Sequence, residues 1–483
     1  MKRTRTLVLV AGLILALVVP LGMVLAAGPS TYGSAFQLQN LEDATANITI
    51  KFYNTDGSVA TTITDTISAS GSNNYFAVLV SGLPDPFSGS AVVSSDKELR
   101  AIHNLYGDDL AFGGAASAGY TAGSADLSLP LIMRNNSGYT TWFSVQNAGS
   151  VASTTAVTFT AGSVGSNYTP AAVTIEPGAS YRFDQADTTQ LGDVFIGSAR
   201  IVSTNGQPLV ATAVEVGPAS LFAYDGFSSV ASTFVVPLFH YNNAGYVSSI
   251  NVQNAGNQDT TVTISYAPSD DGAGGTYGTA CQETQTVAAG ASATFGLYAF
   301  VSVDPPGAAD YVCDCHTKNP GTRFIGSGTV SANTGSQSLV AVVNQLKGST
   351  GHASAYNAFG PNDGSQCASL PLVMDRNSNY WTSINIVNVG SASTTVTIEY
   401  SANAKSGSQT YGQIPDDEVF SLDAGKSRSI LHAPGADPIL DDYVGSARVC
   451  GANSNDELLM IVNELNVVAS GDTLYTYNGF NLD

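Results

Sequence analysis

Four copies of one pattern follow each other along the chain, and this repetition restricts the folds that the sequence can adopt. Each copy contains a short apolar segment that ends in Asn, then a small-residue turn, then a run in which Thr alternates with apolar residues. The Asn residues are Asn40, Asn147, Asn254 and Asn388, at intervals of 107, 107 and 134 residues. Each interval is the length of one small domain, so we expect four similar domains.

Each copy continues with an eleven-residue string that has Gly in its sixth position. We predict a β-hairpin from each string, with a strand, a tight turn at Gly and a second strand. The strings cover residues 66–76, 173–183, 285–295 and 420–430. A Gly-Ser pair then opens a further strand, at Gly89, Gly197, Gly326 and Gly445. Three copies close with Tyr-x-x-Phe, starting at Tyr224, Tyr356 and Tyr477.

Short strands with a period of two residues, frequent turn signals and no helical period indicate an all-β protein. We predict four tandem Ig-like antiparallel β-sandwich domains after an N-terminal signal peptide. The expected boundaries are 1–27 for the signal peptide and 28–126, 127–232, 233–366 and 367–483 for the four repeats. Only 11% of the residues are charged, and we expect these sandwiches, joined by Pro-containing strands, to form a semi-rigid rod.

Two sets of motifs carry a resemblance to known proteins. Strings of the type VTIEPGAS resemble the hairpin of secreted bacterial Ig-like repeat modules. The larger pattern, from VQNAGS through GSAR to YNGF and LPLIMRNNSGY, resembles tandem-repeat surface proteins of filamentous bacteria over nearly the whole chain after residue 27. The resemblance implies a cell-surface or extracellular-matrix setting. It transfers no catalytic residue, because such sandwiches host many unrelated roles.

The N-terminal segment has the pattern of a signal peptide. Three basic residues precede an uncharged apolar run from Leu7 to Ala27, which ends in small residues. Cleavage after Ala26 or Ala27 would place the protein outside the cell or on its surface, with no membrane insertion afterwards. The run is also long enough to remain as an anchor. The formal charge of −21 argues against nucleic acid as a partner, because a polyanion is repelled by it.

The cysteines lie only in the last two repeats: Cys281, Cys313, Cys315, Cys367 and Cys450. The third repeat is longer than the others, and its extra residues contain Cys313, Cys315 and His316. In an exported protein we expect a disulfide from Cys281 to Cys313 or Cys315, and a second between Cys367 and Cys450. The alternative is a metal site of Cys281, Cys313, Cys315 and His316, although C-x-C-H lacks the usual spacer of structural zinc.

Acidic residues recur just before each Gly-Ser strand, and calcium is the one cofactor that they suggest. The candidate ligands are Asp85, Asp187, Asp193, Asp304, Asp310, Asp437 and Asp442. The chain contains no D-x-D-x-D-G loop, so the alternative role of these residues is to stabilise turns and cap short helices.

The sequence contains no catalytic signature. None of the five His residues recurs at one place in all repeats, and no G-x-S-x-G or H-E-x-x-H string occurs. A Ser-His-Asp triad stays open, because its members need not be close in sequence. Trp142 and Trp381 lie near the start of their repeats, where they could stack on a sugar or pack between domains.

These features favour a non-catalytic, secreted structural or adhesive protein of the cell surface or extracellular matrix. Its expected partners are further copies of itself, other surface proteins or glycans. The first alternative is an array of carbohydrate- or protein-binding modules. The second is a hydrolase site in the irregular third repeat.

One predicted strand occurs fewer times than there are repeats. A strand of the LPLIM type occurs three times, at Leu129, Val236 and Leu370, although there are four repeats. Whether it opens one repeat or closes the one before, a terminal sandwich is left one strand short. An unpaired edge can accept a strand from another chain, unless polar residues or a loop cover it.

Overall fold

The computed structural model describes residues 32–482 apart from 108–112, 271–274, 306–307, 309, 334–336, 378, 403–415, 433–442, 467 and 470. These residues form eight antiparallel sheets, so the expected all-β class is confirmed. In this part of the chain no helix is long and apolar enough to cross a membrane. The predicted signal peptide, Asp437 and Asp442 lie outside the described residues.

The second repeat shows the full set of eight strands, in two facing sheets. The sheets have the orders β11-β10-β13-β8 and β12-β9-β14-β15. The strands are β8 Asp126–Arg134, β9 Thr140–Asn147, β10 Ser153–Val164, β11 Val173–Ile175, β12 Ser180–Asp184, β13 Phe195–Ser203, β14 Leu209–Val216 and β15 Leu221–Asp225, with the 3-10 helix η2 Thr189–Leu191. Phe143 of β9 meets Phe159 of β10 across the buried space between the sheets.

The third and fourth repeats have the same plan with one strand added to each. The third has the sheets β16-β22-β18-β19-β21 and β20-β17-β23-β24, and the fourth has β28-β27-β30-β25-β33 and β29-β26-β31-β32. The elements of the third are β16 Thr233–Tyr241, β17 Val247–Asn254, β18 Thr260–Pro268, β19 Cys281–Val287, β20 Ser292–Phe295, β21 Val312–Cys313, α1 Cys315–Lys318, β22 Phe324–Ala332, β23 Leu339–Lys347 and β24 His352–Asn357. Those of the fourth are β25 Cys367–Asp375, β26 Tyr380–Asn388, β27 Thr394–Ala402, β28 Glu418–Leu422, β29 Ser427–Leu431, β30 Tyr443–Gly451, β31 Leu458–Asn466, β32 Leu474–Asn478 and β33 Phe480–Leu482.

Among its described residues, the first repeat has one strand fewer than the second. Its described sheets are β4-β1-β6-β7 and β3-β2-β5. The elements are β1 Tyr32–Asn40, β2 Ala46–Asn54, β3 Val59–Ile67, β4 Ser72–Phe76, η1 Ala77–Leu79, β5 Gly89–Ser95, β6 Leu99–Gly107 and β7 Gly114–Ala118. The strands of the LPLIM type, β8, β16 and β25, pair with β13, β22 and β30 of the repeats that follow them in sequence. They therefore open their repeats, and we call them the opening strands.

The predicted hairpins are wrong. In the second repeat β11 pairs with β10, whereas β12 pairs with β9 in the other sheet, and the same division occurs in all four repeats. The glycines at these turns, Gly178, Gly290 and Gly425, have φ values of 77°, 75° and 72°, and the turn carries the chain from one sheet to the other. Counted from β8, the sheets hold strands 4-3-6-1 and 5-2-7-8. Immunoglobulin domains instead join strands 1-2-5-4 and 3-6-7.

The repeated Asn makes the same set of hydrogen bonds in each repeat, and these bonds explain why every copy has Asn at this position. Asn147 is fully buried at the end of β9, and its side-chain amide donates to the carbonyls of Val151 and Ile175, both at 2.8 Å. Its side-chain oxygen accepts the N–H of Gly149. Asn40, Asn254 and Asn388 make equivalent bonds in their repeats. Each Asn thus fastens a turn of one sheet to the end of a strand in the other.

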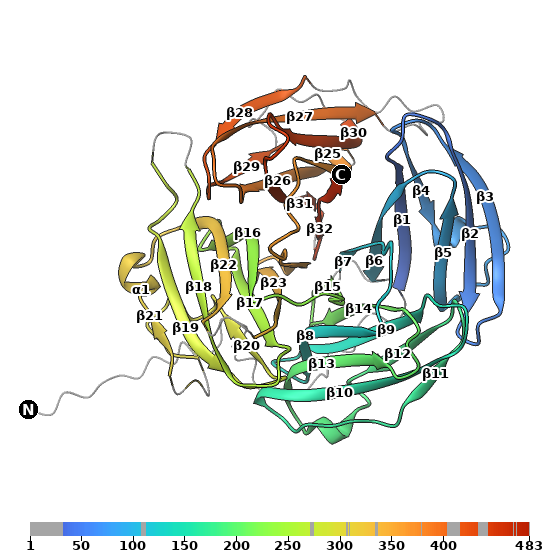
Figure 1. The fold of residues 1–483 in the computed structure, drawn as a ribbon, viewed down its shortest axis with the longest axis horizontal. Helices are drawn as coiled ribbons and strands as arrows, with labels where there is room; N and C mark the ends of the chain where they lie inside the picture. Colours follow the sequence, from blue (N-terminus) through green and yellow to red (C-terminus); the bar gives the residue numbers. More distant parts are fainter. Residues whose placement is uncertain are drawn as a thin grey trace, which may run out of the picture.

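The four repeats form a closed ring and not the expected rod (Figure 1). The ring closes where β1 of the first repeat meets β25 of the fourth: the Gln37 side chain donates to the Pro371 carbonyl, and the Ser369 hydroxyl donates to Gln39 Oε1, each at 2.6 Å. Ile102 of β6 packs into the core of the fourth repeat. Strands β7, β15, β24 and β32 lie at the centre of the ring and are mostly buried, so a rod would leave them exposed to water.

Candidate functional site

Strands β7, β15, β24 and β32, one from each repeat, meet at the centre of the ring, and we call them the axial strands. They contact one another in cyclic order, β7 with β15, β15 with β24, β24 with β32 and β32 with β7. Figure 1 labels β7, β15 and β32 near the centre of the ring. The space left between them is about 10 Å³, which is room for about one water molecule. The described residues of the axial strands therefore form a packed hub, and the space between them is too small for a ligand.

Amide and carboxylate side chains join neighbouring axial strands. The Asn357 side chain accepts the N–H of Asp225 at 2.9 Å and donates to its carbonyl at 2.7 Å. The Asp225 carboxylate accepts the N–H of Ala118 at 2.9 Å, and the Asn478 side chain donates to the Asn357 carbonyl at 2.8 Å. Each side chain satisfies backbone groups that a sheet would otherwise pair.

Asp472 binds the other three repeats at once. Its carboxylate accepts the N–H of Leu221 in the second repeat at 2.9 Å and that of Ala353 in the third at 2.7 Å. Its backbone carbonyl accepts the N–H of Gly114 in the first repeat at 3.1 Å. The side chain is fully buried, and burial raises the pKa of the carboxyl well above its usual range.

Other buried carboxyls surround the hub. Burial raises the pKa of Glu215 and of Glu464 to about 8 and that of Asp225 to about 6. Glu215 accepts a hydrogen bond from Asn344 of the third repeat at 2.8 Å. Glu215 and Glu464 each lie opposite a threonine on the neighbouring strand. At the equivalent position of the third repeat, Gln345 lies opposite a serine. An uncharged side chain is therefore compatible with this position.

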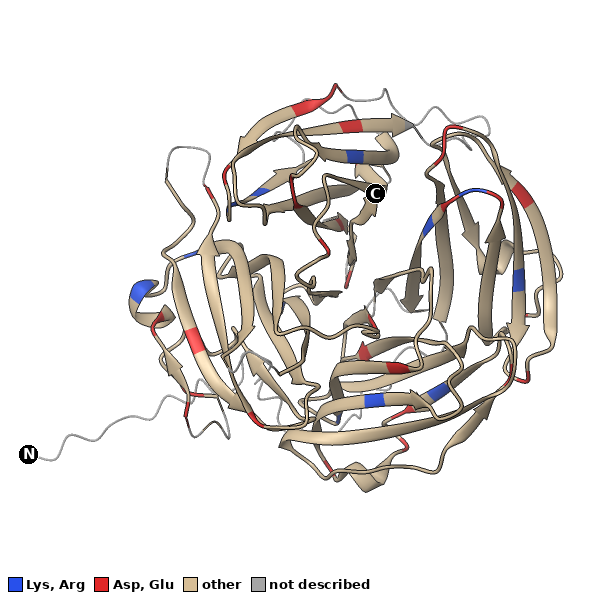
Figure 2. Cartoon of the chain, in the orientation of Figure 1, with Lys and Arg blue, Asp and Glu red and all other residues tan. Residues whose placement is uncertain are grey.

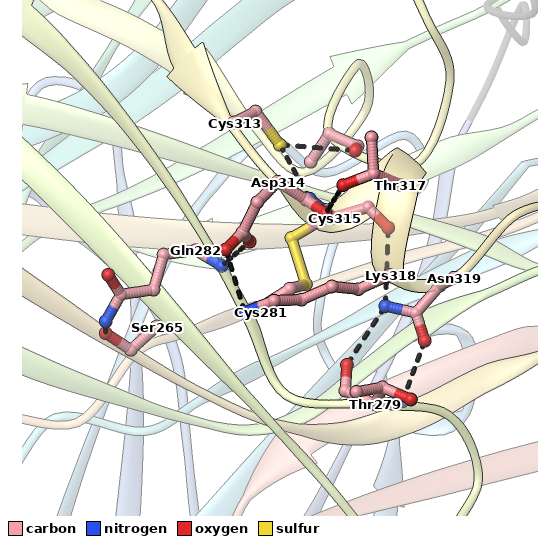
Figure 3. A network of polar contacts seen from close by, with 11 residues as sticks. Ser265, Thr279, Cys281, Gln282, Cys313, Asp314, Cys315, Thr317, Lys318 and Asn319 are labelled. Carbon is pink, nitrogen blue, oxygen red and sulfur yellow. Dashed lines mark hydrogen bonds and ion pairs between the residues drawn. A yellow bond between two sulfur atoms is a disulfide. The ribbon is translucent and has the colours of Figure 1, made fainter.

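The insertion of the third repeat is closed by a disulfide between Cys281 and Cys315, with an S–S distance of 2.05 Å (Figure 3). This is one of the two pairings expected from the sequence. Asp314 accepts the N–H of Gln282 at 2.8 Å and forms an ion pair with Lys318 at 2.8 Å. A second disulfide joins Cys367 and Cys450, which lie opposite each other on β25 and β30.

The metal alternative is not favoured in this oxidised state. Among the described residues, the one group that could hold a metal is Cys281, Asp314 and Cys315, and both sulfur atoms are already bonded to each other. A metal requires the thiolate form. Cys313 remains a thiol, directed at the Ala299 carbonyl at 3.3 Å, and burial raises its pKa.

A hollow of about 450 Å³ lies beside this insertion, where a hydrolase site was an alternative. Its lining includes Asp304, Tyr311, Cys313 and His316 together with valines. A nucleophilic cysteine needs a lowered pKa, and burial shifts the pKa of Cys313 upward. The geometry at this thiol therefore does not favour covalent catalysis.

Two serine hydroxyls lie beside the ring of His103. Ser34 Oγ lies 2.7 Å from His103 Nε2, and the other ring nitrogen faces the Ser117 hydroxyl at 3.4 Å. A triad would place a carboxylate there. Burial also lowers the pKa of His103 to about 4, which makes the imidazole a weak base.

The described Asp candidates for calcium do not converge, since none of them belongs to the cysteine-containing group above, which is the one such group in the described part of the chain. The Asp310 carboxylate accepts hydrogen bonds from the Thr286 hydroxyl and from the Thr286 N–H, and these bonds lower the pKa of Asp310. Asp85 precedes a cis proline, and the Asp193 carbonyl accepts hydrogen bonds from Arg134 and Asn135. Asp187 and Asp304 likewise lie outside that group.

Both tryptophans lie on sheet faces turned toward the preceding repeat. Trp142 of β9 meets Tyr32 of the first repeat edge to face at 5.7 Å, and the Arg182 guanidinium lies 4.3 Å from its ring centre. Trp381 is half-buried on β26, the strand that packs against β16. These positions correspond to packing between repeats.

The edge of β5 in the first repeat is the best candidate for an interaction site. Ala91 of β5 is exposed, whereas Ala199 and Ala447 at the same position are 0% and 2% exposed beneath an opening strand. Val93 is half-buried where Ile201 is fully buried. Among the described residues, none of the strands therefore takes the place beside β5 that an opening strand takes in the other repeats.

The face opposite this edge is also less covered than its counterparts. Ser144 and Gln146 of β9 are half-buried, whereas Asn251 and Gln253 of β17, beneath β8, are 3% and 2% exposed. The sequence indicated that a terminal repeat lacks a strand but not which residues border the gap. Lining up the four copies at the repeated Asn would have shown a hydroxyl six residues earlier in each: Ser34, Thr141, Ser248 and Thr382. Asp472 gave no signal, because it has no counterpart in the other copies.

Comparisons with known proteins leave the family open. No family model matches the chain, and no curated protein matches it. Among the solved structures that match, two show low similarity to this chain. A glycoside hydrolase family 32 structure from Bifidobacterium adolescentis has 8% identity and a TM-score of 0.16, covering 89% of this chain and 98% of that one. The E. coli alpha-2-macroglobulin has 10% identity and a TM-score of 0.11, covering 92% of this chain and 28% of that one. Neither carries an argument about function.

Proposed function

We propose that the chain is an exported, non-catalytic structural or adhesive protein of the cell surface or extracellular matrix. In this proposal each repeat is one β-sandwich domain, Ig-like in having two facing sheets but with its own strand order. The observation that carries the proposal is the closure of the four repeats around the buried hub. A closed ring holds the outer loops of its four repeats in a fixed arrangement. Several loops can then bind one surface at the same time, and weak individual contacts add up to stable binding.

The surface and the disulfides support this role. Charged residues are sparse over all four repeats (Figure 2), and two disulfides suit an oxidising location outside the cytoplasm. The side chains with shifted pKa values at the hub are buried in packing contacts between repeats, where a substrate has no access.

The test is immunogold electron microscopy of cells that make the protein. We expect label on the envelope or in the surrounding matrix, and the purified protein should bind isolated envelope or matrix material. Label confined to the cytoplasm would contradict the proposal. Turnover of a substrate that a single substitution at Cys313 or His316 abolishes would replace it with the hydrolase alternative.

A further inference from the structure

The three opening strands are held by the same two contacts. Their edge pairs with β13, β22 or β30. In addition, a hydroxyl on the facing sheet of the same repeat accepts a hydrogen bond from one backbone N–H of the opening strand. Thr141 accepts the N–H of Met133 at 3.0 Å, and Thr382 accepts the N–H of Met374 at 2.8 Å. Ser248 does the same for His240 in the third repeat.

The first repeat keeps both halves of this arrangement without the strand. The edge of β5 in the first repeat is equivalent to the edge of β13 in the second. Ser34 on β1 is equivalent to Thr141 on β9. The Ser34 hydroxyl is half-buried and faces His103. The segment 89–95 contains no charged residue and no proline, which are common means of blocking an edge.

The place beside β5 fits one strand and not a second sheet. In the second repeat β8 lies between the edge of β13 and the β17 and β23 strands of the third repeat, which contact it from the other side. In the second repeat, β9 and β14 are the counterparts of β17 and β23. By analogy, we expect β9 and β14 to border the place beside β5 in the first repeat. A sheet edge from a second copy would bring several further strands, whereas the equivalent places hold β8 or β16 alone, or β25 with the three-residue strand β33.

The opening strands also define the chemistry of the occupant. They read LSLPLIM, FVVPLFH and ASLPLVM, and their prolines, Pro130, Pro237 and Pro371, all lie at a bulge in the pairing. They are uncharged, apolar and extended. A chain with a net charge of −21 and an uncharged edge here offers no favourable partner for an acidic segment.

We propose that the edge of β5 accepts one extended, uncharged, apolar strand of the Leu-Pro-Leu type from another protein chain. The strand pairs with β5, donates an N–H to Ser34 and covers Ala91 and Val93. This inference rests on the structural or adhesive role proposed above, and it names the chemistry by which a partner is held.

The test measures binding of a synthetic peptide with the sequence of residues 127–135 to the full chain and to a form that begins at Gly28. We expect saturable one-to-one binding to both forms. Ser34→Ala should weaken binding about 3- to 10-fold, the usual contribution of one hydrogen bond. Ser58→Ala, which removes an exposed hydroxyl of a turn in the same repeat, should have no effect.

A second variant keeps the test independent of folding. Ala91 is exposed in the free protein, so Ala91→Asp should leave the melting temperature unchanged and abolish peptide binding, because the added strand would bury the new charge. Ala91→Ser is the matched control and should bind like the unmodified protein.

Four results would overturn the inference: no binding to either form, equal binding to Ala91→Asp, self-association through this edge without peptide, or binding only to the form that begins at Gly28. The third would assign the place to a second copy, and the fourth to the chain's own N-terminal segment. Failure here with label on the cell envelope overturns this inference alone. Peptide binding with cytoplasmic label overturns the proposed location instead.

Discussion

Removing the Asp472 carboxylate should loosen the hub more than any surface substitution. Asp472→Ala leaves the buried N–H groups of Leu221 and Ala353 without an acceptor. Each unsatisfied buried group costs about 1–3 kcal/mol, so we expect a loss of about 2–6 kcal/mol in the free energy of unfolding. Asp472→Asn has nearly the same size and keeps one acceptor oxygen, so it should lose about half as much.

Two measurements check this expectation. Denaturant unfolding gives the loss of stability, and amide hydrogen exchange reports on the two N–H groups themselves. Both amides should be strongly protected in the unmodified protein and should exchange faster in the variants, while amides inside β10 and β13 keep their protection.

Asp259→Ala is a suitable control, because this exposed carboxylate also accepts one backbone N–H, that of Ala289. Its loss should stay below about 1 kcal/mol. If Asp472→Asn were as stable as the unmodified protein, with both amides still protected, the reasoning about the hub would be refuted.

Three further predictions concern other parts of the molecule. Because burial raises the pKa of Glu215 and Glu464 from 4.5 to about 8, the folded state holds more protons than the unfolded state between these values. Stability should therefore fall as the pH rises from about 4.5 to 8, and replacing both by Gln should flatten this dependence in thermal melts. Cys281→Ser opens a loop of 34 residues and should cost about 3–4 kcal/mol. A reducing agent should destabilise the unmodified protein by more than this substitution does, because it also opens the disulfide between Cys367 and Cys450. Trp142→Ala should lower the melting temperature without changing any glycan-array signal, whereas loss of such a signal on changing Trp142 and Trp381 would support sugar binding.

The sequence predicted the strands well because their side-chain alternation is a local property. The segments near Asn147 and Gly197 became β9 and β13, and the LPLIM segment became β8. The hairpin prediction failed because a turn at Gly178 looks the same in sequence whether the next strand pairs beside the last one or crosses to the facing sheet. Pairing partners depend on distant residues, which periodicity does not encode.

The arrangement of the repeats was harder to predict than their strands. The small residues of the axial strands, such as Ala115 and Ala116, were compatible with an ordinary sandwich face. Their burial among four repeats depends on Asp472 and on Asn357, single residues far apart in the sequence. The absent opening strand was countable in the sequence. The position of the gap follows from the solvent exposure of Ala91, which can be read from the structure but not from the sequence.

The position of Asp472 has a consequence for the order of folding. A chain is synthesised from its N-terminus, and domains generally fold in that order. The N–H groups of Gly114, Leu221 and Ala353 must wait for an acceptor that belongs to the last repeat. Contacts across such sequence distances form slowly. The first three repeats therefore exist for a time as a partial ring in which the axial strands β7, β15 and β24 are not yet covered by the fourth repeat. During this time chaperones and proteases can reach residues that are buried in the complete ring.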